Sequence, residues 1–156
     1  MTLRDYKTDD APILSQMLSE EGMEAGEMRF GAEGFRTFVL EGEGGAVGFF
    51  TLMPLRRVWY LQHFCVNRKH RGQGLAWILI KNLKSVVLSF GCPILLVGIP
   101  KGEGKKYLKA VFEHHPTIKA YEEDEKNFYY SILLENFSKE PGGLRHIERR
   151  QLSNHE

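Results

Sequence analysis

The chain has 156 residues, of which 42% are hydrophobic and 26% are charged, a balance typical of one globular domain with a hydrophobic core. Its formal net charge is only +1, so the composition does not indicate binding to nucleic acid or to an anionic membrane surface. The N-terminal residues lack the apolar core of a signal peptide, and no apolar run approaches the length of a membrane span. We therefore expect a cytoplasmic protein.

The two cysteines, Cys65 and Cys92, each lie in or beside a predicted buried strand, where inert core thiols are common. No metal-ligand spacing surrounds them, and the adjacent His114 and His115 would not converge on one ion. The sequence therefore predicts a reduced protein without a bound metal.

The N-terminal part of the chain predicts one strand and one helix. Residues 2–6 have the pattern of a short strand, and Thr8 or Asp9 can cap an amphipathic helix over residues 11–19. Residues 20–34 are acidic and contain glycine, so they predict a loop or an irregular helix.

A hairpin, a longer strand and a long helix follow. Residues 35–41 and 46–53 predict two strands joined across a glycine-rich turn at residues 42–45. Residues 58–66 predict the next strand, and residues 75–90 predict an amphipathic helix. The apolar residues of this helix are numerous, which indicates that it is buried and central.

The last predicted elements are shorter. Residues 93–97 form an apolar run typical of a buried strand, and residues 105–114 predict a short helix that ends before a proline. Residues 118–122 and 128–134 predict a final hairpin. The polar residues 136–156 predict a C-terminal tail.

The most distinctive segment lies between the strand at 58–66 and the long helix. Gly72 and Gly74 allow the backbone to approach a ligand closely, because glycine has no Cβ. The first N–H groups of the helix have no intrahelical partner and suit a phosphate. Arg68, Lys69 and Arg71 add positive charge. The segment predicts a site for a phosphorylated ligand, although a tight turn alone would also explain the glycines.

Other phosphate-binding motifs do not fit. The dinucleotide fingerprint requires glycine or alanine three positions after Gly74, where this chain has Trp77. A second glycine-rich segment resembles a P-loop, but Gly98 and Gly104 are too far apart and Lys106 replaces the Ser or Thr that binds Mg²⁺. These mismatches argue against nucleotide hydrolysis.

The pattern that fits is Arg-x-x-Gly-x-Ala, formed by Arg71, Gly74 and Ala76 after an apolar strand and before a long amphipathic helix. This arrangement resembles the acetyl-CoA-binding signature of the GNAT-superfamily N-acetyltransferases. The order of elements is similar to that family over roughly residues 1–134, and the detailed motif agreement covers about residues 60–97.

The resemblance implies an α/β fold with a mixed, mostly antiparallel central sheet of about six to seven strands flanked by helices. A V-shaped splay between the fourth and fifth strands would admit the pantetheine arm of the cofactor. Residues 1–135 would form a single acetyl-CoA-binding domain, followed by the tail at residues 136–156.

The resemblance also implies direct transfer of an acetyl group from the co-substrate acetyl-CoA to an amine, either a cationic small molecule or a protein amine. Backbone groups of Phe64, Cys65 and Val66 would pair with pantetheine, as exposed strand edges can. The amides that would hold the pyrophosphate are those of Arg71, Gly72, Gln73, Gly74, Leu75 and Ala76. No nucleic-acid or membrane partner is expected, and a homodimer is left open.

The catalytic residues depart from the family pattern. Many members have a Glu where this chain has Gln62 and His63. His63 can act as a general base near neutral pH and Gln62 can orient a water, but a hydrogen-bonded structural His63 is an open alternative. The family often has a Tyr-Glu pair where this chain has Phe112-Glu113, so Tyr107 is the remaining candidate acid. Tyr107 can equally have a packing role, in which case water would protonate the departing thiolate.

The geometry of the strand affects these assignments. In a regular strand, Tyr60 and Gln62 share one face and His63 lies on the other. A bulge would alter that arrangement.

An acidic segment falls where the family places its acceptor-binding loop. Its carboxylates are Glu20, Glu21, Glu24, Glu27 and Glu33. A rim of carboxylates would favour a cationic amine. The alternative is a solvated charged face without a binding role.

Two other functions remain open from the sequence. The missing Glu and Tyr leave room for an acyl-CoA-binding sensor or interaction module with little catalytic activity. A domain whose glycines only form a turn is the second alternative.

Overall fold

The computed structural model describes residues 1–31, 33–55, 58–91, 94–100, 118–123 and 125–133. The predicted helix at residues 105–114, with Tyr107 and the Phe112-Glu113 pair, lies outside the described residues. Cys92 and the predicted tail at residues 136–156 also lie outside them.

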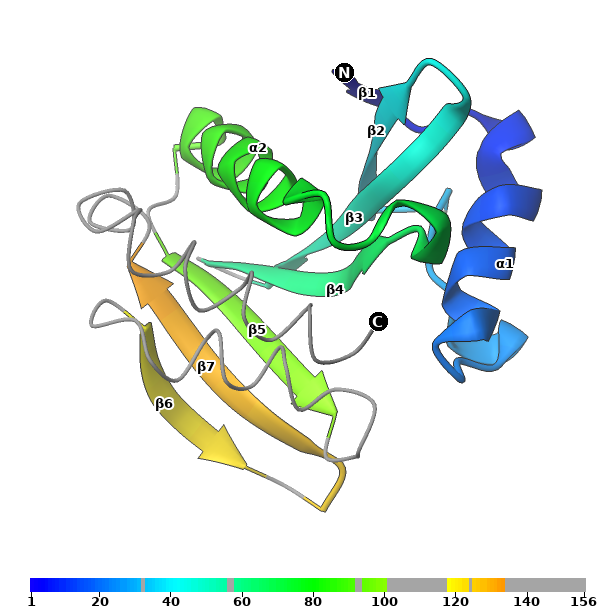
Figure 1. Cartoon of the computed structure of the whole chain (residues 1–156). Helices are drawn as coiled ribbons and strands as arrows, with labels where there is room; N and C mark the ends of the chain where they lie inside the picture. Colours follow the sequence, from blue (N-terminus) through cyan, green and yellow to red (C-terminus); the bar gives the residue numbers. More distant parts are fainter. Residues whose placement is uncertain (32, 56–57, 92–93, 101–117, 124, 134–156) are drawn as a thin grey trace.

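The strands of the described residues form one seven-stranded sheet with the order β1-β2-β3-β4-β5-β7-β6 (Figure 1). Their bounds are β1 Thr2–Asp5, β2 Arg36–Gly42, β3 Gly45–Leu55, β4 Val58–Val66, β5 Ile94–Pro100, β6 Ile118–Glu123 and β7 Asn127–Leu133. All neighbouring strands are antiparallel except β4 and β5, which are parallel. The prediction of a mixed, mostly antiparallel sheet is confirmed.

Two α-helices occur in the described residues, α1 (Ala11–Glu20) and α2 (Leu75–Ser89), and they cover opposite faces of the sheet (Figure 1). Adjacent residues of β2 demonstrate this arrangement, because successive side chains of a strand point to opposite faces. Val39 packs in the core under α1, whereas Leu40 packs in the core under α2. Three short 3-10 turns complete the described elements, namely η1 Thr8–Asp10, η2 Ala25–Glu27 and η3 Arg68–His70.

Helix α2 packs closely on the sheet because β3 has a glycine beneath it. A Cβ on Gly48 would lie 3.0 Å from the carbonyl oxygen of Cys65 and 3.3 Å from Cδ2 of Leu79. Only glycine therefore fits this position without displacing the helix or the strand. This packing determines where the first turn of α2 lies relative to the end of β4.

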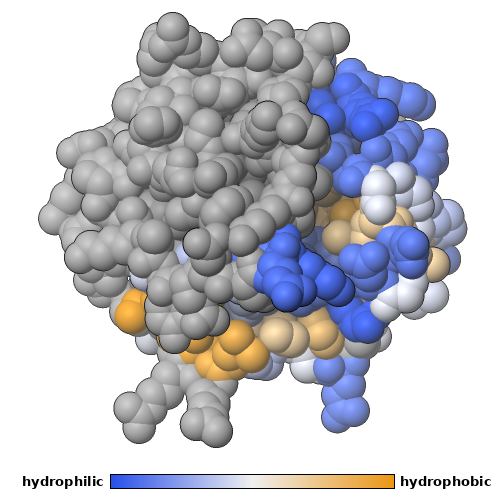
Figure 2. Space-filling model, turned by 90° about the horizontal axis from the view of Figure 1, so that it is seen from below, coloured by the Kyte–Doolittle hydropathy of each residue, from blue (hydrophilic) through white to orange (hydrophobic). Residues whose placement is uncertain are grey.

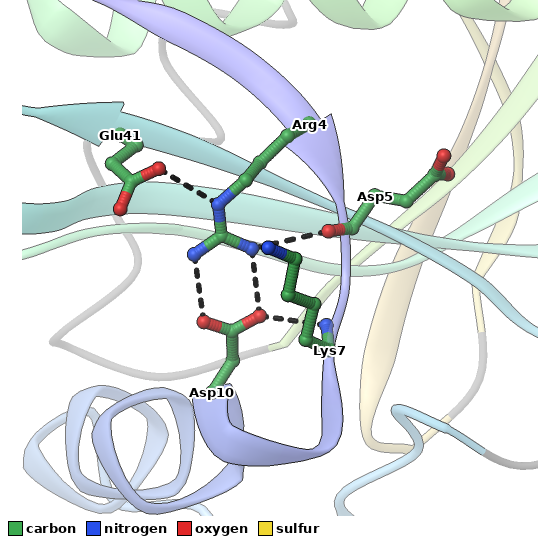
Figure 3. A network of polar contacts seen from close by, with 5 residues as sticks. All are labelled: Arg4, Asp5, Lys7, Asp10 and Glu41. Carbon is green, nitrogen blue, oxygen red and sulfur yellow. Dashed lines mark hydrogen bonds and ion pairs between the residues drawn. The ribbon is translucent and has the colours of Figure 1, made fainter.

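The start of α1 differs from the prediction. Asp10 is the N-cap, whereas Thr8 and Asp9, the predicted caps, belong to the preceding turn η1. The Asp10 side chain makes no capping hydrogen bond to α1; its carboxylate instead accepts two hydrogen bonds of 2.8 Å from Arg4 and one of 2.7 Å from the backbone N–H of Lys7 (Figure 3). The predicted cap is wrong because Thr8 and Asp9 form part of a separate 3-10 turn, and α1 begins only after Asp10.

Strand β4 contains a bulge at Gln62, beside the residues predicted for catalysis. In the register with β3, Thr51 pairs with His63 and Leu52 pairs with Leu61, so Gln62 is the extra residue. A bulge shifts the alternation of side chains by one position. Leu61 therefore packs under α2, while His63 faces the aromatic rings on the α1 side. The bulge alternative, and not the regular strand, is the one observed.

Strands β4 and β5 pair only near their N-terminal ends. Their ladder has three pairs, which are Trp59 with Leu95, Tyr60 with Leu96, and Leu61 with Val97. Beyond these pairs, the described parts of β4 and β5 continue to Val66 and Pro100 without pairing to each other. The predicted V-shaped splay between the fourth and fifth strands is confirmed, and among the described strands the second half of β4 pairs with β3 alone.

Candidate functional site

The segment between β4 and α2, residues 67–74, is called the signature loop below. Asn67 fixes its start, because its backbone N–H donates to the carbonyl of Val47 at 2.8 Å and its side-chain oxygen accepts from the backbone N–H of Lys69 at 3.1 Å. Asn67 is buried, and turn η3 follows directly. The loop is therefore held on the sheet by its first residue, directly after the end of β4.

Both signature glycines have left-handed backbone conformations, with φ of +83° at Gly72 and +73° at Gly74. Residues with a Cβ adopt this region at a cost, which explains the glycines in the motif. A Cβ on Gly74 would meet no atom within 4 Å. The requirement for glycine there thus comes from the backbone, and the space beside it is open to a ligand.

The N-terminus of α2 follows directly. Gly74 is the N-cap and offers no side chain for capping, and the first intrahelical bond runs from the N–H of Ile78 to the carbonyl of Gly74 at 3.3 Å. The amides of Leu75, Ala76 and Trp77 therefore precede the helical ladder, at the positive end of the helix dipole. Their side chains are buried, so their backbone groups are the part suited to an anion.

Two cations of the signature loop contact the C-terminal end of α1. Arg71 forms an ion pair with Glu21 through Nη2, and the two side chains are only 15% and 9% exposed. Nη2 of Arg68 donates to the carbonyl oxygen of Glu20 at 2.6 Å. The Nε atom of Arg71 is buried and has no hydrogen-bond partner in the described part of the chain. A buried N–H donor of this kind suits an anionic oxygen of a ligand.

The residues predicted to contact pantetheine, Phe64, Cys65 and Val66, lie in the half of β4 that has left β5. The Cys65 side chain is buried in the core under α1, while Phe64 and Val66 pack against the core under α2. Their side chains are thus engaged in packing. The backbone edge of these residues that faces β5 is not paired with it.

His63 is almost fully buried, with 2% exposure, between the rings of Phe30 and Phe49. Its Nε2 accepts a 2.8 Å hydrogen bond from the backbone N–H of Arg29, so the proton of the neutral ring resides on Nδ1. Burial, and secondarily the charge of Arg29, lowers the pKa of His63 to about 4. The ring is therefore neutral at physiological pH, and its acceptor atom holds the loop that follows η2.

Tyr60 was not among the predicted catalytic residues, although it lies where β4 and β5 separate. A Cβ on Gly98 of β5 would collide with the Tyr60 hydroxyl and lie 3.0 Å from the ring of Tyr129. The hydroxyl therefore reaches across to β5 at the base of the splay. Gln62, two residues further along β4, is the bulge residue and is partly buried, and it follows directly on the last pair between β4 and β5.

The acidic segment does not behave as one set of carboxylates. Glu21 is paired with Arg71, and Glu20 accepts a long 3.4 Å hydrogen bond from Gln16. Glu24, Glu27 and Glu33 are exposed. On the α1 side, which is on the right in both views, the described surface seen from below is largely hydrophilic (Figure 2).

Within the described ranges, no helix combines the length and apolar character needed to cross a membrane. The same residues contain no group of three or more His, Cys, Asp or Glu side chains that could hold a metal ion.

Comparison with known proteins agrees with this geometry. The model of the acetyltransferase (GNAT) family matches residues 3–102. No curated protein sequence matches the chain significantly.

Many solved structures share the fold at low sequence identity. A GNAT-family acetyltransferase from Staphylococcus aureus has a TM-score of 0.70 and 11% identity, covering 85% of this chain and 98% of that one. A spermidine N-acetyltransferase chimera from Vibrio cholerae and hSSAT has a TM-score of 0.67 and 14% identity, covering 88% and 99%. The aminoglycoside 6'-N-acetyltransferase from Enterococcus faecium has a TM-score of 0.60 and 14% identity, covering 86% and 97%.

The splayed sheet and the signature loop are thus accompanied by a family match over most of the chain, and the protein belongs to the acetyltransferase (GNAT) family.

Proposed function

We propose that the protein is a cytoplasmic N-acetyltransferase that moves an acetyl group directly from acetyl-CoA to an amine. The observation that carries this proposal is the left-handed Gly72–Gly74 turn, which leads into the uncapped N-terminus of α2 beside the β4–β5 splay. The buried Nε of Arg71, which has no hydrogen-bond partner among the described residues, is a second feature that fits an anionic ligand at this place.

In this proposal the cofactor lies across both features. The pyrophosphate rests on the amides of residues 71–76, where the helix dipole and the absence of a Cβ favour it. The pantetheine arm runs along Phe64, Cys65 and Val66 and takes the position that a continued β5 would have occupied.

Acetyl transfer requires that the amine lose a proton before attack and that the departing thiolate gain one. His63 can take a proton on Nε2 only by releasing the N–H of Arg29, and its low pKa makes it a weak base. We therefore propose that Gln62 orients a water that carries the proton away, and that His63 holds the Arg29 loop in place. Tyr60 joins Tyr107 as a candidate for protonating the thiolate, because its hydroxyl lies at the base of the splay.

The second candidate function is an acyl-CoA-binding sensor with little activity. It is favoured by Gln62 in place of the family's Glu and by the hydrogen bond that occupies His63. It differs from the first candidate in one measurable way, since acetyl-CoA would bind without thiol release in the presence of amines.

The test has two steps. Thermal denaturation with millimolar acetyl-CoA should raise the melting temperature, because the ligand binds only the native state. Free-thiol release is then measured across a panel of polyamines, aminoglycosides, lysine derivatives and peptide N-termini. Binding with turnover supports the enzyme, binding without turnover supports the sensor, and the absence of a thermal shift contradicts both.

We further propose that the acceptor is a cationic amine. The support is the exposed trio Glu24, Glu27 and Glu33 on the segment that precedes β2, and two structural neighbours are named for spermidine and aminoglycoside acetylation. Replacing Glu24 and Glu27 with Gln should raise KM for polyamines and leave KM for neutral amines unchanged. Faster acetylation of neutral amines by the wild type would contradict this choice of acceptor.

A further inference from the structure

Two contacts attach the signature loop to the C-terminal end of α1, and their partners on α1 lie outside the Arg-x-x-Gly-x-Ala pattern. One is the ion pair between Arg71 and Glu21, and the other is the hydrogen bond from Arg68 to the carbonyl of Glu20. Residues 20 and 21, which precede the carboxylates proposed to bind the acceptor, are therefore joined to the loop proposed to bind acetyl-CoA.

The position of Glu21 is rigidly defined. It is the C-cap residue of α1, and its N–H donates to the carbonyl of Leu18 at 3.0 Å. Helix α1 is itself anchored by Leu14, Met17 and Leu18, which are buried against the sheet. A carboxylate on such a support can fix the direction of a flexible arginine side chain.

The pair is also well shielded from water, since the Glu21 side chain is 9% exposed and that of Arg71 is 15% exposed. When one member of a desolvated ion pair is removed, the other remains as an uncompensated buried charge. Loss of Glu21 would therefore release Arg71 from its place and, with it, the backbone that leads into Gly72.

We propose that Glu21 is a positioning residue for acetyl-CoA: it holds Arg71, and through Arg71 the signature loop, in the binding geometry before the ligand arrives. This inference rests on the proposed function. A ligand site that is organised in advance avoids the cost of ordering the loop on binding. Glu21 engages Nη2 of Arg71 and leaves the buried Nε as a donor for the ligand, so the carboxylate orients the guanidinium without occupying all of it.

The opposite role for Glu21 would be competition, in which the carboxylate keeps Arg71 away from the phosphates. The two roles predict opposite changes in the affinity for acetyl-CoA when Glu21 is replaced. Positioning predicts that Glu21→Gln weakens acetyl-CoA binding, whereas competition predicts tighter binding. Simple charge attraction also predicts tighter binding, because the substitution removes a negative charge near an anion site.

The experiment is a titration of the full chain with acetyl-CoA, in which isothermal titration calorimetry measures Kd. We expect Glu21→Gln to raise Kd by at least about tenfold, which corresponds to roughly 1.4 kcal/mol. The matched control is Glu20→Gln, because Glu20 contacts Arg68 through its carbonyl oxygen, which the substitution retains. This control should bind acetyl-CoA as tightly as the wild type or slightly more tightly.

A double-mutant cycle tests whether Glu21 acts through Arg71. In an Arg71→Gln background, Glu21→Gln should cause little additional loss of affinity, because the interaction is already absent. In steady-state kinetics, the loss should be larger in KM for acetyl-CoA than in kcat. Additive losses in the cycle, or a loss confined to kcat, would overturn the positioning role.

Hydrogen exchange of the ligand-free protein provides a readout that does not need turnover. The amides of residues 68–77 should exchange faster in Glu21→Gln, while those in the middle of α2 keep their protection. If Glu21→Gln does not fold, Glu21→Asp replaces it. This variant keeps the negative charge on a shorter side chain, so it should show the same weakening of acetyl-CoA binding and the same faster exchange of residues 68–77, both to a smaller extent.

The outcomes separate the two proposals. Unchanged or tighter binding by Glu21→Gln, or unchanged exchange in the signature loop, overturns the role of Glu21. Failure of the wild type to bind acetyl-CoA overturns the proposed function, whatever the variants do.

Discussion

His63 lies under the loop that contains Arg29, and its ring accepts the amide hydrogen of that residue through Nε2. Protonation of the ring would convert this acceptor into a donor and would place a charge in a buried aromatic environment. The folded protein therefore resists protonation, and the pKa of His63 falls to about 4. The same contact that limits His63 as a base makes the stability of the folded protein sensitive to acid.

The first prediction concerns stability against pH. The unfolded chain binds a proton at His63 near pH 6.5, while the folded protein binds it only near pH 4. Between these values the unfolded state carries more protons, so the free energy of unfolding should fall as pH is lowered from 6.5 to 4. The contribution of His63 is about 3 kcal/mol at most, and urea denaturation at a series of pH values measures it.

The control for this prediction keeps the hydrogen bond and removes the titration. In His63→Gln the amide oxygen can accept from Arg29 at any pH, so the decrease between pH 6.5 and 4 should become smaller. An unaltered slope in His63→Gln would show that another group causes the acid sensitivity.

Helix α2 is bounded by two glycines in the same conformation, and this permits a matched comparison. Gly74 at its start has φ of +73° and Gly91 after its end has φ of +79°, and an added Cβ would meet no atom within 4 Å at either position. Alanine at either site should destabilise the protein by about 1–2 kcal/mol, because of the left-handed backbone.

The second prediction uses the shared backbone conformation of Gly74 and Gly91. Gly74→Ala should abolish or strongly reduce the thermal shift caused by acetyl-CoA, because the new methyl group occupies the side on which the ligand approaches. Gly91→Ala should lose similar stability and keep the shift. Equal shifts in the two variants would contradict the assignment of the signature loop as the cofactor site.

The third prediction concerns the contact between α2 and the sheet. Gly48→Ala places a methyl group 3.0 Å from the Cys65 carbonyl oxygen and 3.3 Å from Leu79, so it should destabilise the protein by about 1–3 kcal/mol. Gly44→Ala, in the hairpin turn of the same strand pair, meets no atom within 4 Å and should be nearly neutral. Chemical denaturation of both variants measures the difference, and equal stabilities would contradict this account of the packing.

At the scale of the whole molecule, Arg4 connects three elements. It donates twice to Asp10 at the start of α1 and once to Glu41 of β2, each at 2.8 Å (Figure 3). These hydrogen bonds lower the pKa of Asp10, because Arg4 stabilises the ionised carboxylate. The edge strand, α1 and the neighbouring strand are thereby held in one arrangement.

The fourth prediction tests this network. Asp10→Ala removes one of the two carboxylate partners of the partly buried Arg4 guanidinium and should destabilise the protein by about 2 kcal/mol. Asp5→Ala is the control, because Arg4 contacts Asp5 through its backbone carbonyl, which the substitution retains, and the Asp5 side chain forms a 3.8 Å ion pair with Arg36 in which both side chains are well exposed. Such pairs contribute about 0–1 kcal/mol. Thermal denaturation compares the two, and an equal loss would mean that the network is not stabilising.

Much of the fold was predictable because it depends on local patterns. The strands and α2 were predicted close to their observed positions from hydrophobic periodicity, and the β2–β3 turn was confirmed by the pairing of Gly42 with Gly45. The N-cap of α1 was predicted wrongly, since Thr8 and Asp9 form a 3-10 turn before the helix and Asp10 takes the N-cap position. The bulge at Gln62 could not be assigned from the strand itself, because it is defined by the register with β3.

In the candidate site too, some features were predictable from the local sequence and others depend on tertiary contacts. The sequence by itself determined the signature loop, since left-handed glycines and a helix start are properties of a few consecutive residues. Only the tertiary structure decided that Arg71 faces Glu21 and that His63 holds Arg29, because these partners come from segments distant in the chain. Ion pairs and pKa values depend on which segments meet and how far they exclude water, and folding establishes both.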